Sequence, residues 1–81
     1  MIRRLILIRA FWDDEAKVWV AASDDMEGLM AEAATIEKLR DKLLVMISEL
    51  LELDNVESDL PEIPVHIMAE MSARVRNPRA A

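Results

Sequence analysis

One apolar stripe with the spacing of an α-helix constrains the fold of this chain more than any other feature. Thr35 is a candidate N-cap, and Glu37 follows in the first turn, where the helix dipole favours negative charge. Large apolar residues then recur at steps of three and four, with three more beside them: Ile36, Leu39, Leu43, Met46, Leu50 and Leu53, flanked by Leu44, Ile47 and Leu51. A stripe this wide is typical of a helix that packs on a sheet, so the sequence predicts a helix over 36–53 with a sheet beneath it.

Four other segments have the patterns of β-strands. Residues 2–12 and a segment that resumes at Val18 are separated by an acidic turn at 13–16, which predicts a hairpin. Residues 29–34 by themselves fit a strand or a helix, and we assign them to a short third strand, after a polar break that contains the one glycine of the chain. Over 63–75 every second residue is apolar, and this period of two predicts a final strand.

The order of these elements, β-β-β-α-β, defines an α+β fold class. Because a strand–helix–strand crossover places the final strand parallel to a neighbour in the same sheet, we expect a four-stranded sheet in the order 3-2-1-4 with the long helix on one face. The domain is expected to span 1–76, with a frayed tail at 77–81. The opposite face lacks a helix and presents Leu5, Leu7 and Phe11, with Trp19 or Met30. We therefore predict self-association, as a homodimer or tetramer, through Leu5, Leu7, Phe11 and Trp19.

The composition narrows the class of protein further. The 81 residues are 53 % apolar, which argues against a disordered chain, and the absence of cysteine excludes disulfide scaffolds and thiol chemistry. No apolar run approaches the ~20 residues that cross a bilayer. No export signal opens the chain, so we expect a cytoplasmic protein that does not engage a membrane.

The formal net charge of −6 is concentrated in the middle of the chain, where residues 13–32 hold seven carboxylates and one lysine. A nucleic-acid footprint needs clustered lysine and arginine, so no direct contact with nucleic acid is expected. An acidic surface fits a basic protein partner instead. The residues predicted to contact that partner are Asp13, Asp14, Asp24, Asp25 and Glu27.

Other chemical uses of these residues are less consistent with the sequence. The two acidic groups lie in expected turns, where aspartate favours the turn itself, and at opposite ends of the second strand, so no metal site is predicted. His66 has no nucleophile motif beside it, so no catalytic residue is predicted. The aromatic residues Phe11, Trp12 and Trp19 are assigned to packing rather than to stacking on bases or a flavin, so no cofactor is predicted.

The methionines divide between two expected environments. Met46 lies on the helix stripe and Met71 on the apolar face of the last strand, so both are predicted to be core residues. Met26, Met30 and Met68 are candidates for an interface, where methionine adapts to irregular partners.

The block from 18 to 53 resembles the HicB-like antitoxin family, bacterial proteins with a truncated RNase H-like fold. The likeness lies in the order of a strand ending in small residues (18–23), an acidic turn closed by glycine (24–28), a short strand, and a Thr35-capped helix with paired leucines. Glu27 stands where the family often has proline, and no segment after Val75 has the pattern of the DNA-binding element that longer antitoxins add. The resemblance implies a toxin-neutralising module of the short single-domain branch, whose partner is a small basic RNase.

Together, these features predict a non-catalytic protein-interaction module of the HicB antitoxin type, which neutralises a small basic RNase toxin through an acidic surface. Three other interpretations stay open. An orphan oligomeric domain without a toxin partner would have the same sequence pattern. A small-ligand-binding oligomer, such as a flavin-storing shell, would need its helix between the first two strands. A nuclease on an RNase H-like scaffold would need the acidic residues as metal ligands.

Overall fold

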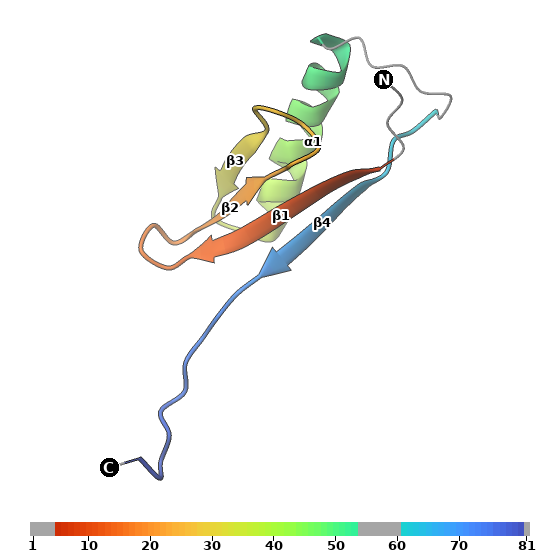
Figure 1. The fold of residues 1–81 in the computed structure, drawn as a ribbon. Coiled ribbons are helices and arrows are strands. Elements are labelled where there is room, and N and C mark those ends of the chain that lie inside the picture. The colour runs from red at the N-terminus through yellow and green to blue at the C-terminus, as the bar shows by residue number, and fades with distance from the viewer. Residues whose placement is uncertain (1–4, 54–60, 81) are drawn as a thin grey trace.

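In the computed structural model, which describes residues 5–53 and 61–80, a four-stranded sheet carries one helix on one face (Figure 1). The elements are β1 (Ile6–Asp13), β2 (Val18–Ala22), β3 (Met30–Ala33), α1 (Ile36–Leu53) and β4 (Val65–Glu70). The strand order is β3-β2-β1-β4; β1, β2 and β3 pair antiparallel, and β4 pairs parallel to β1. The predicted α+β class, strand order and single covering helix are confirmed.

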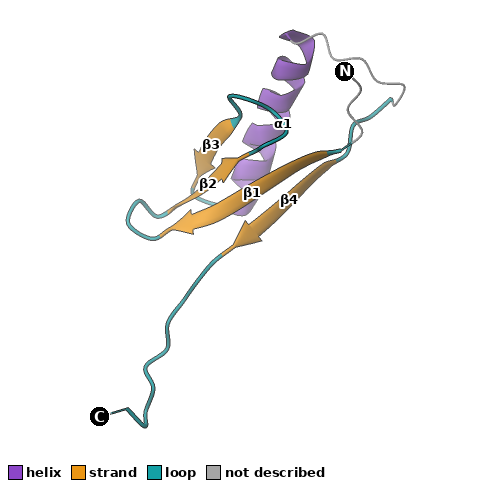
Figure 2. Ribbon diagram, in the orientation of Figure 1, coloured by secondary structure: helices purple, strands orange, loops and turns teal. Residues whose placement is uncertain are grey.

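The hydrophobic core lies between the helix and one face of the sheet. In β1 the residues that alternate toward the helix, Ile6, Ile8 and Ala10, are fully buried. Ala10 faces Ala21 of β2 across the antiparallel ladder. These two small side chains leave room for the helix, which approaches β3 and β2 most closely and passes behind them in Figure 2.

The helix begins and packs largely as the stripe predicts. Its N-cap is confirmed, since the backbone N–H of Lys38 donates a hydrogen bond to Thr35 Oγ1 at 3.1 Å. The buried residues are Leu39, Leu43 and Ile47, which repeat every four positions. The predicted stripe is too wide, because Leu44 is 45 % exposed on the flank of the helix.

The prediction of a strand over 63–75 is wrong beyond Glu70. The last residue pair between β1 and β4 is Phe11 with Glu70, and β1 ends two residues later in a turn. Alternation of apolar residues requires only an extended backbone, whereas a strand also requires a neighbour, and no described segment pairs with the chain after Glu70. Residues 71–80 are exposed and continue away from the sheet in the direction of β4 (Figure 1).

The expected domain span of 1–76 stays a prediction; β4 ends at Glu70, and the exposed chain after it is longer than the expected tail at 77–81. Met71, predicted to lie in the core, is 58 % exposed because it lies in this tail. The start of the predicted first strand at 2–4 and most of the polar connector, 54–60, lie outside the described residues.

Candidate functional site

The face of the sheet opposite the helix, called here the open face, carries exposed apolar side chains. Leu5, Leu7 and Phe11 lie on it and are between 42 % and 49 % exposed. Met30 lies on the same face, because residues that pair across neighbouring strands share a face of the sheet. Met30 pairs with Ala22 of β2, and Ala22 pairs with Arg9 of β1. An exposed apolar cluster on a sheet is a feature of surfaces that bind other molecules.

Trp19 does not belong to this cluster. It pairs with Trp12, and both lie on the face that the helix covers, where their rings meet edge to face with centroids 5.5 Å apart. Trp19 packs against the buried core. The four residues predicted for self-association therefore do not share one surface; Leu5, Leu7 and Phe11 do, and Met30 takes the place proposed for Trp19. Self-association through the open face stays a prediction.

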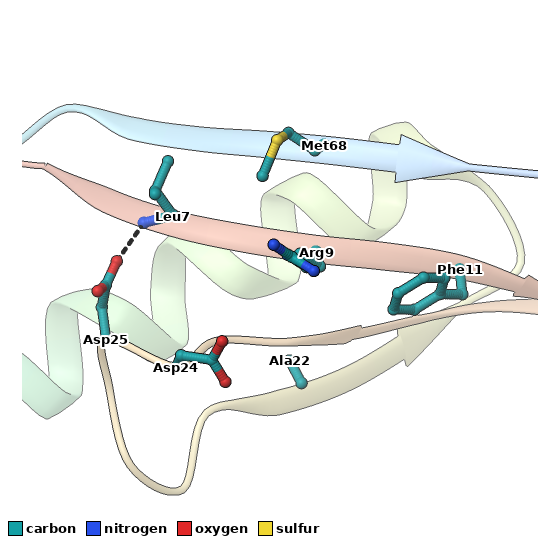
Figure 3. Close-up of a pocket in the computed structure, with 7 residues that line it drawn as sticks. All are labelled: Leu7, Arg9, Phe11, Ala22, Asp24, Asp25 and Met68. Carbon is teal, nitrogen blue, oxygen red and sulfur yellow. Dashed lines mark hydrogen bonds between the residues drawn. The ribbon is translucent and has the colours of Figure 1, made fainter.

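A hollow of about 420 Å³ lies on the open face beside the loop that follows β2 (Figure 3). Its lining combines apolar side chains with one guanidinium and two carboxylates: Leu7, Arg9, Phe11, Ala22, Asp24, Asp25 and Met68. In Figure 3 the side chains of Leu7, Arg9 and Phe11 follow one another along β1, and Asp24 and Asp25 lie on the side of the loop. This hollow is the candidate functional site.

Hydrogen bonds to one residue of β1 hold the acidic loop against the sheet. Asp25 Oδ2 accepts a hydrogen bond from the backbone N–H of Leu7 at 2.7 Å, drawn in Figure 3. Ser23 Oγ donates to the backbone oxygen of Leu7 at 2.7 Å and accepts from the backbone N–H of Asp25 at 3.1 Å. The carboxylate of Asp25 thus has a structural role in addition to lining the hollow.

Two buried side chains anchor the same loop from below. Met26 and Leu29 lie in the hydrophobic core, so Met26 is not available for an interface, for which the sequence makes it a candidate. The loop turns at Gly28, whose φ of +83° is in the left-handed region that favours glycine. Since the loop buries Met26, the acidic side chains on either side of it, Asp24 and Glu27, are turned outward and exposed.

The other acidic group forms the turn between β1 and β2. Asp13 Oδ1 accepts backbone hydrogen bonds from Glu15 and Ala16, which closes the turn. Lys17 Nζ lies 2.8 Å from Asp14 Oδ1. The hydrogen bond from Lys17, and a second from the indole N–H of Trp12, lower the pKa of Asp14 below its ordinary value.

The structure therefore separates the five predicted partner-binding residues into two places. Asp24, Asp25 and Glu27 lie at the end of β2, with the first two beside the apolar hollow. Asp13 and Asp14 lie at the other end of β2, in the hairpin turn (Figure 1). Of the remaining lining residues, Met68 is one of the predicted interface candidates, whereas Arg9 is not predicted, although its pairing with Met68 places it on the open face.

Within 5–53 and 61–80, no group of three or more acidic or histidine side chains is placed to hold a metal ion. His66 is exposed on β4. In the described part of the chain, no helix has both the length and the apolarity that crossing a membrane requires.

Comparison with known proteins places the chain in a family. The chain is similar to the hypothetical protein TTHA1013 from the extremely thermophilic bacterium Thermus thermophilus, whose crystal structure is known. The two are 47 % identical over 91 % of this chain and 100 % of that one, with a TM-score of 0.65. No curated protein matches the chain. A family described as a domain of unknown function, DUF1902, matches residues 5–77, and the chain therefore belongs to this family.

Proposed function

We propose that this chain is a non-catalytic protein-interaction module of the HicB antitoxin type, which neutralises a small basic RNase by binding it on the open face. The observation that carries the proposal is the hollow in which Leu7 and Phe11 lie beside Asp24 and Asp25. Protein interfaces commonly combine apolar side chains with polar groups. The hollow does so, with Arg9 between Leu7 and Phe11 on β1 and the two carboxylates on the side of the loop.

The charge distribution favours a basic partner. Asp24 and Glu27 are exposed on the loop that borders the hollow, and the chain as a whole has a net charge of −6. A lysine or arginine of the partner that approaches Asp24 would bring its neighbouring apolar side chains onto Leu7 and Phe11. The carboxylates then accelerate association, and the apolar contacts provide the affinity.

The proposal requires that a basic protein of similar or smaller size is encoded beside this chain. That protein is the partner used in the test. The two proteins are co-expressed and purified, and their association is followed at increasing salt. We expect the double variant Asp24→Lys and Glu27→Lys to slow association about tenfold at low salt and much less at high salt. The matched control is Glu49→Lys with Glu52→Lys, which makes the same change in net charge at exposed positions of α1.

A second variant tests the apolar half of the site. Leu7→Ser with Phe11→Ser should increase the dissociation rate while leaving the salt dependence of association unchanged. Equal binding by the acidic-loop variant and the helix control, or the absence of any basic protein encoded beside this chain, would contradict the proposed function.

A further inference from the structure

The outer edge of β4 is the less protected of the two edges of the sheet. Edge strands are usually short or carry lysine, proline or a bulge, because their unpaired backbone groups can join another sheet. The other edge strand, β3, has four residues, and Lys42 Nζ donates a hydrogen bond to the backbone oxygen of Glu32 at 2.8 Å. β4 has six residues, with no lysine or proline among them.

The direction of the backbone groups shows which residues would pair along this edge. The N–H of Ile6 donates to the backbone oxygen of Pro64 at 3.0 Å. In a parallel ladder every second residue directs both backbone groups to the same neighbour, so the even-numbered residues of β4 face β1. Val65, Ile67 and Ala69 therefore direct their N–H and C=O groups outward, away from β1.

The exposed tail extends this edge. Met71, Ala73 and Val75 continue the alternation of β4, and Val75 is 93 % exposed. Because of the tail, the radius of gyration is 16.3 Å, against about 12 Å for a compact chain of this length. An extended segment with one regular apolar face and no described neighbour has the form of a strand whose partner is another chain.

Charges along the segment favour that partner being a second copy in antiparallel orientation. The side chains on the open-face side begin with Glu62 and include Glu70, and they end with Arg74 and Arg76. A parallel partner would bring like charges together, whereas an antiparallel copy brings the acidic end of each segment against the basic end of the other.

We propose that the segment 62–74 pairs antiparallel with the same segment of a second copy, about a two-fold axis at Met68, to form one continuous eight-stranded sheet. In this register Glu62 faces Arg74 of the second copy, and His66 faces Glu70. On the other side of the sheet, Val65 faces Met71, and Ile67 faces Ala69. The contact is isologous, so each pair occurs twice.

This pairing goes beyond the proposed function, since it needs no basic partner protein. A two-fold axis perpendicular to the sheet places both helices on one side and both open faces on the other. The dimer would then present two hollows on one continuous surface.

Cysteine cross-linking tests the pairing directly, because the chain has no cysteine of its own. Met68→Cys places two sulfurs across the two-fold axis in a non-hydrogen-bonded pair, whose Cα separation suits a disulfide. We expect this variant to form a covalent dimer under mild oxidation. The matched control is Met30→Cys, a methionine on the same face at the opposite edge strand, which should form no covalent dimer.

Charge exchange tests the register. Arg74→Glu should weaken dimerisation, measured by sedimentation equilibrium, by about tenfold, because two symmetric ion pairs become repulsive contacts. Adding Glu62→Arg to this variant should restore the affinity. Arg79→Glu makes the same charge change in the tail beyond the paired segment and should have little effect.

The proposal is overturned if Met68→Cys cross-links no faster than Met30→Cys, or if Glu70→Cys or Ser72→Cys cross-links faster than Met68→Cys. It is equally overturned if the chain sediments as a monomer, or if Glu62→Arg fails to rescue Arg74→Glu. None of these results bears on binding of a basic partner, so the two proposals fail independently.

Discussion

The carboxylate of Asp25 accepts a hydrogen bond from the backbone N–H of Leu7 at 2.7 Å, in place of a backbone group of β2. The last ladder pair at this end of β1 and β2 is Arg9 with Ala22, and continuing the register would set Leu7 opposite Asp24. Side chains of the loop instead satisfy both backbone groups of Leu7, since Ser23 Oγ bonds its oxygen. The loop is thereby fastened to the central strand while Asp24 stays exposed.

Removing this carboxylate should destabilise the fold. Asp25→Ala leaves the N–H of Leu7 without its charged acceptor, and we expect a loss of about 1.5–3 kcal/mol in the free energy of unfolding, measured by urea denaturation. Asp25→Asn retains an oxygen acceptor and should lose less than half as much. Equal losses for the two variants would show that the hydrogen bond to Leu7 is not the cause.

Two neighbouring leucines of the helix allow the effect of burial to be measured on the same type of side chain. Leu43 is buried against the sheet, and its neighbour Leu44 is 45 % exposed. Leu43→Ala should lower the free energy of unfolding by about 2–5 kcal/mol, because it removes buried methyl groups and leaves a cavity. Leu44→Ala should change it by about 0.5 kcal/mol or less. Similar losses at both positions would contradict the way in which the helix packs on the sheet.

The pH dependence of the hairpin turn depends on Lys17. Because its hydrogen bond lowers the pKa of Asp14 in the folded state, the contribution of this contact is present above the unfolded pKa and is lost as the pH falls through the folded value. Lys17→Met should raise the pKa of Asp14 toward its ordinary value, measured by NMR titration of the carboxyl carbon. The hydrogen bond from Trp12 remains in this variant, so a small depression should persist. An unchanged titration curve would rule out Lys17 as the main cause.

There is space for a side chain at Gly28, but the backbone conformation there is unfavourable for other residues. A Cβ at this position meets nothing within 4 Å, yet the φ of +83° is unfavourable for other residues. Gly28→Ala should therefore cost about 1 kcal/mol of stability, and Gly28→Asn less, since asparagine enters the left-handed region more readily. Thermal unfolding of the three proteins provides the comparison; an order in which asparagine is the worse substitution would contradict a purely backbone origin.

Much of the candidate site was predictable, and its gaps have definite causes. The alternation of β1 placed Leu7 and Phe11 on the uncovered face, and turn chemistry placed Asp24 and Asp25 in a loop. One error arose because a residue's face depends on strand register: Trp19 pairs with Trp12 on the helix side, so of Trp19 and Met30 only Met30 lies on the open face. Periodicity is defined within one segment, so it does not show how two segments align.

The sequence by itself determined which segments become helix or strand, the order of those elements, and the residue that caps the helix. These properties depend on side-chain spacing and local hydrogen bonding, which act over a few neighbouring residues. Only the tertiary structure decided that Met26 is buried, that β4 ends at Glu70, and that the Asp25 carboxylate bonds to Leu7. Each of these depends on what lies beside a residue in space, and that is set by the packing of segments far apart in the chain.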